Sequence, residues 1–260
     1  MIDFHNHIIP NLDDGSKSVQ MSLDMLNEAQ SQGITDIINT IHFQHPKMED
    51  KDTSYNFVIN EIKKMQEIAK NNNININIHA ASEVFFKYNL TEILDNPITT
   101  FGNGKYMLIE FQRLSFPKNY EEEIFKLQLK NITPIIAHPE RYRTIQNNLS
   151  LVDKWIDRGY KIQIDCASIM GGFGKETQTT AINLLEKGFC HLLGSDAHNN
   201  KTRNFLMKPT LENISNTFNN DISLILKSNA EKVLNGLQLD SYTYNKTKKS
   251  FFEKVKSFLR

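Results

Sequence analysis

Two histidines two residues apart, His5 and His7, follow a short apolar run near the N-terminus. Residues i and i+2 of a β-strand point to the same face, so both imidazoles can reach one point. Imidazole nitrogen is a common ligand for divalent metals. An isolated pair of this kind is better explained as an exposed strand end, so its meaning depends on the other polar residues of the chain.

Further histidines and acids follow other apolar runs. They are His42, Glu83, Glu110, His138, Asp196 and His198. Nitrogen and oxygen donors without cysteine suit Zn, Mn or Fe sites for hydrolysis and argue against a closed structural zinc site. Each residue alone is better explained as an ion pair or a loop contact, but their recurrence at strand after strand favours one metal site. His45, His79 and His191 do not fit the pattern, and we interpret them as structural.

The elements that must position these residues alternate between strand and helix patterns. After the first strand, β-type runs occur at 34–41, 74–83, 106–110, 132–137, 161–164 and 189–193, and helical patterns at 18–32, 54–70, 90–94, 120–130, 150–158, after 174 and through 204–236. Repeated strand-then-helix units with short loops predict a parallel sheet, and about seven of them predict a barrel. In such a barrel the carboxyl ends of the strands converge on one face, so the polar residues should meet there.

Length and composition indicate one large α/β domain. The 260 residues, 39% of them hydrophobic, suffice for one barrel with a substantial core. With 30 basic and 30 acidic residues the formal net charge is zero, so no global field draws the protein to nucleic acid. The sequence shows no secretory leader, no apolar stretch of about 18 residues, and only two distant cysteines. We expect a cytoplasmic protein.

The C-terminal segment differs from the rest in composition. Residues 241–260 hold six basic side chains against a single acid, Glu253, with apolar residues on one side of a predicted helix. We expect a barrel domain over 1–240 and a basic amphipathic tail over 241–260 that contacts a membrane surface or a partner. A terminal helix packed on the barrel is an equally supported alternative.

Other nucleophilic chemistries find no support. Cysteine-dependent phosphatases need an arginine six positions after the cysteine, but Gly172 and Asp196 stand six positions after Cys166 and Cys190. The chain has no Walker-type glycine loop and no G-x-S-x-G motif. The glycine-rich stretch at 171–174 lacks the lysine of a phosphate loop and is more typical of a helix entry.

Together these motifs resemble the polymerase and histidinol phosphatase (PHP) superfamily. The resemblance runs from residue 1 to about 236 and implies a distorted TIM-like (β/α)7 barrel of the PHP type. Within the superfamily the chain is similar to bacterial manganese-dependent protein tyrosine phosphatases that act beside capsule and exopolysaccharide tyrosine kinases. The motifs that carry it are His5-x-His7, Asp13-Asp14-Gly15, His42, Glu83, Glu110, His138-Pro139-Glu140-Arg141, Ser195-Asp196-Ala197-His198-Asn199 and Arg203.

The resemblance implies a cluster of two to three divalent ions. Mn is the expected metal, with Fe, Zn or Co as alternatives. Many superfamily members have His where this chain has Asp14, which favours the tyrosine phosphatase branch. The implied ligands are His5, His7, Glu83 and Asp196 for a first ion, Glu83, Glu110 and His138 for a second, and Asp14, His42 and His198 for a third.

Two arginines can reach the rim of this cluster. Arg141 follows His138 by three residues and Arg203 follows His198 by five. Guanidinium groups bind phosphate and stabilise transition-state charge, and the resemblance assigns both arginines to substrate binding and catalysis. The acid that protonates the leaving group stays open between Asp14, Glu110 and water.

The expected function is therefore metal-dependent hydrolysis of phosphotyrosine on a bacterial tyrosine kinase that controls capsular or extracellular polysaccharide synthesis. The membrane-associated kinase partner is implied by the resemblance alone. One alternative is a histidinol-phosphatase-like or other small-molecule phosphoesterase of the same superfamily. A non-catalytic kinase-binding adaptor ranks lower, because it has no reason to keep the whole ligand set.

Overall fold

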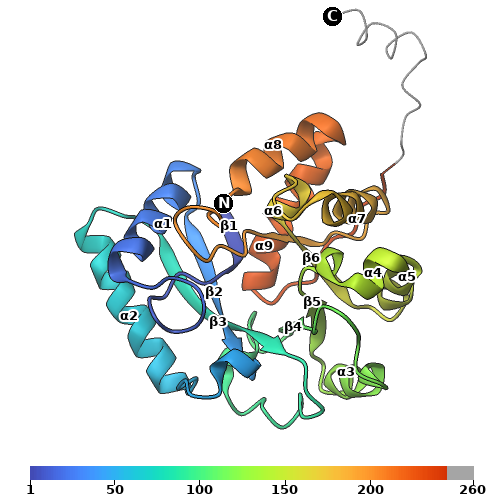
Figure 1. Ribbon diagram of the computed structural model, residues 1–260, viewed down its shortest axis with the longest axis horizontal. Coiled ribbons are helices and arrows are strands. Elements are labelled where there is room, and N and C mark those ends of the chain that lie inside the picture. The colour runs from blue at the N-terminus through green and yellow to red at the C-terminus, as the bar shows by residue number, and fades with distance from the viewer. Residues whose placement is uncertain (245–260) are drawn as a thin grey trace, which may run out of the picture.

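Seven parallel strands lie at the centre of the molecule and pair in the order of the chain (Figure 1). The structure is a computed structural model, and it describes residues 1–244. The strands are β1 (Ile2–Asn6), β2 (Asp36–Phe43), β3 (Asn77–Phe85), β4 (Tyr106–Glu110), β5 (Thr133–Ile136), β6 (Lys161–Asp165) and β7 (Leu192–Gly194).

The first and last strands approach each other and nearly close the sheet into a barrel. The backbone N–H of Asp196 donates to the His5 carbonyl at 2.7 Å, and that of His7 donates to the Ala197 carbonyl at 2.9 Å. The segment that follows β7 makes these bonds, so the closure lies at the carboxyl ends of the strands. The expected TIM-like barrel of seven strands is confirmed.

Helices surround the strands (Figure 1). α1 begins where the Ser18 hydroxyl accepts a hydrogen bond from the Met21 N–H at 3.2 Å. The α-helices are α1 (Val19–Ser31), α2 (Tyr55–Asn71), α3 (Tyr120–Leu129), α4 (Arg143–Asn147), α5 (Ser150–Asp157), α6 (Cys166–Ile169), α7 (Lys175–Glu186), α8 (Met207–Thr217) and α9 (Asn220–Leu234), and the 3-10 helices are η1 (Pro46–Met48), η2 (Pro97–Thr99) and η3 (Pro139–Arg141).

Two apolar clusters hold the barrel together. The larger one fills the space between helices and sheet. In the smaller one, α9 packs on β1 and β7 and contributes Ala230 and Val233. The strands contribute to that cluster Phe4, Ile38, Ala81, Leu108, Ile135 and Leu192.

Some sequence predictions of local structure are wrong. Residues 90–94 form turns rather than a helix: the Glu92 N–H donates to the Asn89 carbonyl at 2.9 Å, and the Leu90 N–H donates to the Glu123 carboxylate at 2.9 Å. β3 starts at Asn77 rather than 74, and β7 starts at Leu192 rather than 189. The helices α4 and α6 were not predicted. They contain five and four residues and are too short to show a helical period.

The end of the described chain packs on the barrel. Tyr242 is buried and its hydroxyl donates to the Leu185 carbonyl at 3.2 Å, while the rings of Tyr244 and Phe218 lie 5.2 Å apart. Most of the predicted basic tail, residues 245–260, lies outside the described residues. None of the helices within 1–244 is both long and apolar enough to cross a membrane.

Candidate metal centre

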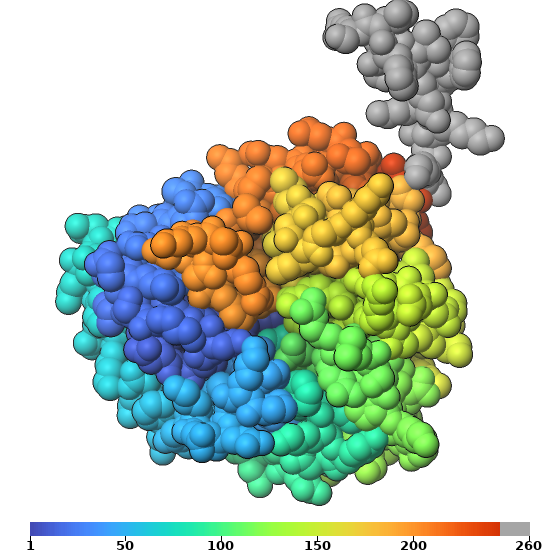
Figure 2. All heavy atoms as spheres, in the orientation of Figure 1, coloured from blue at the N-terminus to red at the C-terminus, as the bar shows by residue number. Residues whose placement is uncertain are grey.

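A cavity of about 540 Å³ opens at the carboxyl ends of the strands. Figure 2 shows this face, where loops from distant parts of the chain surround a hollow near the centre. His5 and His7 lie beneath the cavity, in contact with Glu83 and Asp196. The other predicted ligands line its wall: Asp14, His42, Glu83, Glu110, His138, Asp196 and His198. The structure thus brings together all nine residues that the sequence singled out.

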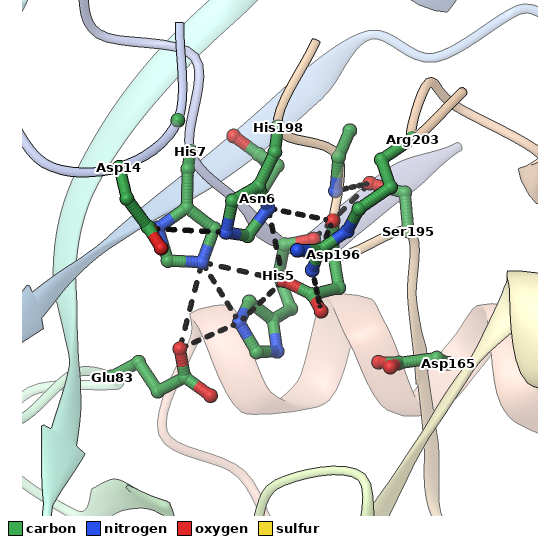
Figure 3. Close-up of polar contacts among 12 residues, drawn as sticks. His5, Asn6, His7, Asp14, Glu83, Asp165, Ser195, Asp196, His198 and Arg203 are labelled. Carbon is green, nitrogen blue, oxygen red and sulfur yellow. Dashed lines mark hydrogen bonds and ion pairs between the residues drawn. The ribbon is translucent and has the colours of Figure 1, made fainter. Parts of the chain in front are cut away.

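The first group of donors joins β1, β3 and the loop after β7. The His5 and His7 Nε2 atoms lie 3.2 Å apart, and each lies 3.2–3.5 Å from Glu83 Oε2. Asp196 Oδ1 lies 3.5 Å from His5 Nε2 and 3.4 Å from His7 Nε2. Figure 3 shows these four side chains pointing toward one another. The His5, His7 and Asp196 donor atoms lie close enough together to bind a single ion, and Glu83 Oε2 lies beside the two histidines.

A second group shares Glu83. Its Oε1 atom lies 2.8 Å from His138 Nε2, which is in turn 3.9 Å from Glu110 Oε1. The other oxygen, Oε2, lies 3.1 Å from His42 Nδ1. Glu83 therefore turns one oxygen to each side, which is the arrangement of a bridging carboxylate.

The third group lies nearer to solvent. Asp14 Oδ1 is 3.2 Å from His42 Nε2 and 3.2 Å from His198 Nε2. The other oxygen of Asp14 forms an ion pair with Lys47 Nζ at 2.5 Å, on η1. Asp14 therefore faces the same point as the two histidines.

Several buried atoms of these groups have no hydrogen-bond partner among the described residues. They are Asp14 Oδ1, His42 Nδ1, Glu110 Oε2 and His138 Nδ1, all buried. Buried polar atoms are rarely left unpaired, so such a concentration needs a further ligand. Histidine and carboxylate donors suit Mn, Fe, Zn or Co. The residues present therefore fit a cluster of divalent ions.

Two side chains behind the cluster orient its histidines, and the sequence analysis missed both roles. The His5 Nδ1 atom lies 3.0 Å from Gln163 Oε1, and His7 Nδ1 lies 2.7 Å from Asp13 Oδ2. An acceptor at Nδ1 leaves the Nε2 lone pair free to face a metal. Asp13 is adjacent to the predicted ligand Asp14 in the sequence. Gln163 lies within β6, and no motif in the sequence indicated that it contacts a histidine.

Two glycines let the backbone pass close to these histidines. A Cβ atom on Gly15 would lie 2.1 Å from the His7 carbonyl oxygen and 2.4 Å from its Cβ. A Cβ atom on Gly194 would lie 2.5 Å from His5 Cβ. Neither position has room for a side chain. The loop after β1 and the end of β7 therefore both pack directly against the histidine pair.

Sharp turns aim two of the predicted ligands. His138 has φ 33° and Asp196 has φ 48°, in the left-handed region that residues other than glycine rarely adopt. Each lies two residues after the end of a strand, β5 for His138 and β7 for Asp196. Such strained backbone clusters at functional sites, where the surrounding structure holds it.

The two predicted arginines lie beside the cluster. Arg141 Nη1 donates to Asp196 Oδ2 at 2.5 Å and to Asp165 Oδ2 at 2.9 Å, and Arg203 Nη2 also pairs with Asp196 Oδ2. The Phe173 ring centroid lies 4.6 Å from Arg141 Cζ and 5.7 Å from Arg203 Cζ. The glycine-rich stretch thus places an aromatic ring against both cations.

Opposite charges shift the protonation of the cluster. Burial would lower the pKa of His5, but Glu83 and Asp196 outweigh burial and raise that pKa to about 9. Burial also favours neutral Glu83, yet His5 and His42 hold its pKa well below the usual range. Burial raises the pKa of Glu110, and the neighbouring Glu83 carboxylate raises it further. A cation that binds here must displace protons from histidines, so its affinity will depend on pH.

The remaining histidines divide into two kinds. His79 pairs with Asp36 at 2.9 Å at the start of β2, and His191 is buried in the core, both as structural residues. His45, which the pattern left out, lines the cavity, and its ring lies 4.7 Å from that of His42. His45 lies two residues after the end of β2 and caps the start of η1.

Comparison with known proteins places this site in a family. Residues 1–235 match the family model described as capsular polysaccharide synthesis, CpsB/CapC. The tyrosine-protein phosphatase YwqE of Bacillus subtilis (strain 168) is 33% identical over 235 residues, covering 90% of this chain and 91% of that protein. The tyrosine-protein phosphatase CpsB of Streptococcus pneumoniae is 30% identical over 209 residues, covering 78% and 85%.

The fold comparison agrees. A solved structure, from work on YwqE of Bacillus subtilis and CpsB of Streptococcus pneumoniae as unique metal-dependent tyrosine phosphatases, matches with a TM-score of 0.88 and 32% identity. The match covers 96% of this chain and all of that one. The family expected from the motifs is therefore confirmed.

Proposed function

The chain belongs to the CpsB/CapC family of capsular polysaccharide synthesis, and we propose that it is a metal-dependent phosphatase that hydrolyses phosphotyrosine in proteins. The observation that carries the proposal is one cluster in which nine histidine and carboxylate side chains face one another beside Arg141 and Arg203. The cluster lines an open cavity, as a site for an exposed phosphorylated side chain requires.

We assign the ligands by the three groups described above. His5, His7, Glu83 and Asp196 would hold one ion, Glu83, Glu110 and His138 a second, and Asp14, His42 and His198 a third. When bound, divalent ions lower the pKa of a water molecule toward neutrality and offset the negative charge of a phosphate. Manganese is the metal we propose, since hard carboxylate oxygens and imidazoles both suit it.

The arginines would bind the phosphate. Both guanidinium groups already lie within contact of Asp196, so a phosphate at the cluster comes within their reach. Asp165 also binds Arg141 at Nη1, and the Phe173 ring lies against both cations. Fixed positive charge at the phosphate oxygens stabilises the charge of the transition state.

A cysteine nucleophile does not fit this chain. Cys166 and Cys190 are both buried and free, and burial raises the pKa of both thiols well above their usual value. Neither lines the cavity. Hydrolysis at the cluster therefore proceeds without a phosphocysteine, and thiol-directed reagents should leave it intact.

We also propose a cellular compartment and a protein partner for this chain. Two free, buried cysteines suit the reducing cytoplasm, which we propose as the location. We propose a membrane-associated bacterial tyrosine kinase as the phosphotyrosine protein. The tail over 241–260 would add a peripheral membrane contact.

The test combines metal analysis with hydrolysis of a phosphotyrosine peptide, with and without added manganese. We expect about two to three metal equivalents and manganese-stimulated hydrolysis, which Glu83→Ala and His138→Ala reduce by about 100-fold or more. Metal-loaded protein that cannot hydrolyse the peptide, or an E83A variant that equals the original, would overturn the proposal. Strong preference for histidinol phosphate would instead favour a small-molecule phosphatase, and a chain that binds no metal would favour the adaptor.

A further inference from the structure

A second hollow adjoins the metal cavity. It measures about 570 Å³ and shares Arg113, Leu114 and Arg141 with the cavity above the cluster. We call it the flanking groove. In Figure 2 the green loop after β4 and the yellow start of α7 lie on the same face as the central hollow. The residues that line the flanking groove but not the cavity are Arg143, Gln146, Phe173, Gly174, Lys175, Glu176 and Thr177.

The groove carries a positive charge. Besides Arg141, which Asp165 and Asp196 neutralise, it holds Arg113, Arg143 and Lys175 against one acid, Glu176. Arg143 pairs with Glu176 at 2.6 Å, and both side chains are exposed. Arg113 and Lys175 are exposed and have no ion-pair partner among residues 1–244. Two cations are therefore left to bind an acidic ligand.

The N-terminus of α7 adds to the positive potential of the groove. Gly174 lies at the N-cap with φ 89° and offers no side chain to the first-turn N–H groups. Gly174, Lys175, Glu176 and Thr177 all line the groove, so the positive end of the helix dipole is located there. α7 spans 12 residues, long enough for the dipole to be effective.

The groove is held in a fixed shape. The Arg143 N–H donates to the Arg113 carbonyl at 2.9 Å, which ties the loop after β4 to α4. Gln146 Nε2 donates to the Glu140 carbonyl at 2.9 Å and to Thr177 Oγ1 at 3.2 Å, which ties α4 to η3 and α7. A rigid groove binds a ligand at a lower entropic cost than a mobile one.

Its junction with the cavity is apolar and exposed. Leu114 lines both hollows and its side chain is 80% exposed. Phe173 lies on the groove side, against Arg141. A polypeptide whose phosphotyrosine enters the cavity can therefore cover Leu114 and continue into the groove, whereas a small phosphate ester ends inside the cavity.

We propose that the flanking groove binds acidic side chains next to the phosphotyrosine of the substrate polypeptide and so selects acidic phosphotyrosine sites. The inference rests on the proposed function, because it requires a phosphotyrosine in the cavity. Charge complementarity and the shared lining with the cavity support an acidic occupant.

The test uses the full metal-loaded chain and three substrates. They are p-nitrophenyl phosphate, a phosphotyrosine peptide with Asp and Glu on both sides, and the same peptide with Asn and Gln instead. We expect kcat/KM to be about fivefold higher for the acidic peptide, because two exposed ion pairs contribute about that much. The preference should decrease when salt is added. Affinity for the matching non-hydrolysable phosphonate peptides, measured by fluorescence anisotropy, should show the same preference.

The decisive variant is Lys175→Glu. An acid in the first turn of α7 suits the helix dipole, so the fold is preserved, and activity on p-nitrophenyl phosphate should not change. The preference for the acidic peptide should disappear or reverse. The matched control is Lys63→Glu on α2, an exposed lysine outside both hollows, which should keep the preference.

Each outcome has one meaning. Equal use of both peptides by the original chain overturns the groove and leaves the phosphatase proposal standing. A preference that survives in Lys175→Glu also overturns the groove. Hydrolysis of p-nitrophenyl phosphate without hydrolysis of either peptide overturns the proposed function, and the groove as a substrate site with it.

Discussion

The Oδ2 atom of Asp196 lies 2.5 Å from Nη1 of Arg141, while the Oδ1 atom of the same carboxylate lies 3.4 Å from His7 Nε2. One short side chain therefore touches both the metal-ligand cluster and a guanidinium group proposed to bind phosphate. Asp196 makes both contacts from a left-handed backbone conformation, with φ 48°. The same Nη1 atom of Arg141 also donates to Asp165 Oδ2, at 2.9 Å.

Changing Asp165 to Asn should weaken catalysis without removing metal. The variant removes the Asp165 charge that pairs with Arg141 Nη1, and we expect kcat/KM for a phosphotyrosine peptide to fall by about tenfold or more. Metal content should stay the same, because Asp165 is not among the proposed ligands. Steady-state kinetics and metal analysis measure the two effects.

The matched control is Asp153→Asn, which breaks an exposed ion pair with Lys187 and should leave kcat/KM unchanged. If Asp165→Asn keeps full activity, the positioning role is wrong. If it loses metal in step with activity, Asp165 supports the cluster rather than the arginine.

Replacing Gln163 by Leu should lower metal affinity. Leu fills a similar volume but offers no acceptor to His5 Nδ1, which now lies 3.0 Å from Gln163 Oε1. Loss of such an orienting contact typically weakens metal binding by about 10- to 100-fold. Competition against a chelator measures the affinity. Gln20→Leu, which removes only an exposed hydrogen bond to Asp24, is the control; equal affinities of the two variants would refute the prediction.

Changing Gly15 to Ala should destabilise the fold by steric conflict. The new Cβ would lie 2.1 Å from the His7 carbonyl oxygen, so the loop after β1 must move. We expect the free energy of unfolding to drop by about 3 kcal/mol. Gly104→Ala is the control, because its Cβ has no neighbour within 4 Å and the cost is only that of φ +80°, about 1 kcal/mol. Equal losses in urea unfolding would contradict the steric explanation.

His191 should make stability depend on pH. Burial, aided by Lys161, lowers its pKa from 6.5 to about 3. Between these values the unfolded chain binds a proton that the folded chain excludes, so this contribution to stability is complete above pH 6.5 and decreases as the pH falls. The slope from this single group reaches about 1.4 kcal/mol per pH unit.

Urea unfolding of the original chain and of His191→Gln, from about pH 7 to about pH 5, measures the difference in slope. The variant should lose stability less steeply as the pH falls. Parallel curves for the original chain and His191→Gln would show that its titration does not contribute.

Much of the fold was predictable because its signals are local. Apolar runs of four to eight residues and helical periods mark most strands and helices, and short loops between them require parallel pairing. The misses have physical causes: the Leu90 segment is held by Glu123 from another part of the chain, and α4 and α6 are too short to show a period. No local pattern carries such information.

The donor chemistry and the approximate meeting place of eight of the nine predicted ligands could be inferred from the residues alone, whereas Asp14 was expected only from the family resemblance. Histidines and acids at successive strand ends must converge, because a β/α barrel brings all those ends to one face. How they meet could not be predicted: which oxygen of Glu83 faces which histidine, that Gln163 and Asp13 orient His5 and His7, and that the flanking groove adjoins the cavity. These features depend on contacts between side chains from different loops and strands, whose directions are set by packing across the barrel rather than by neighbours in the chain.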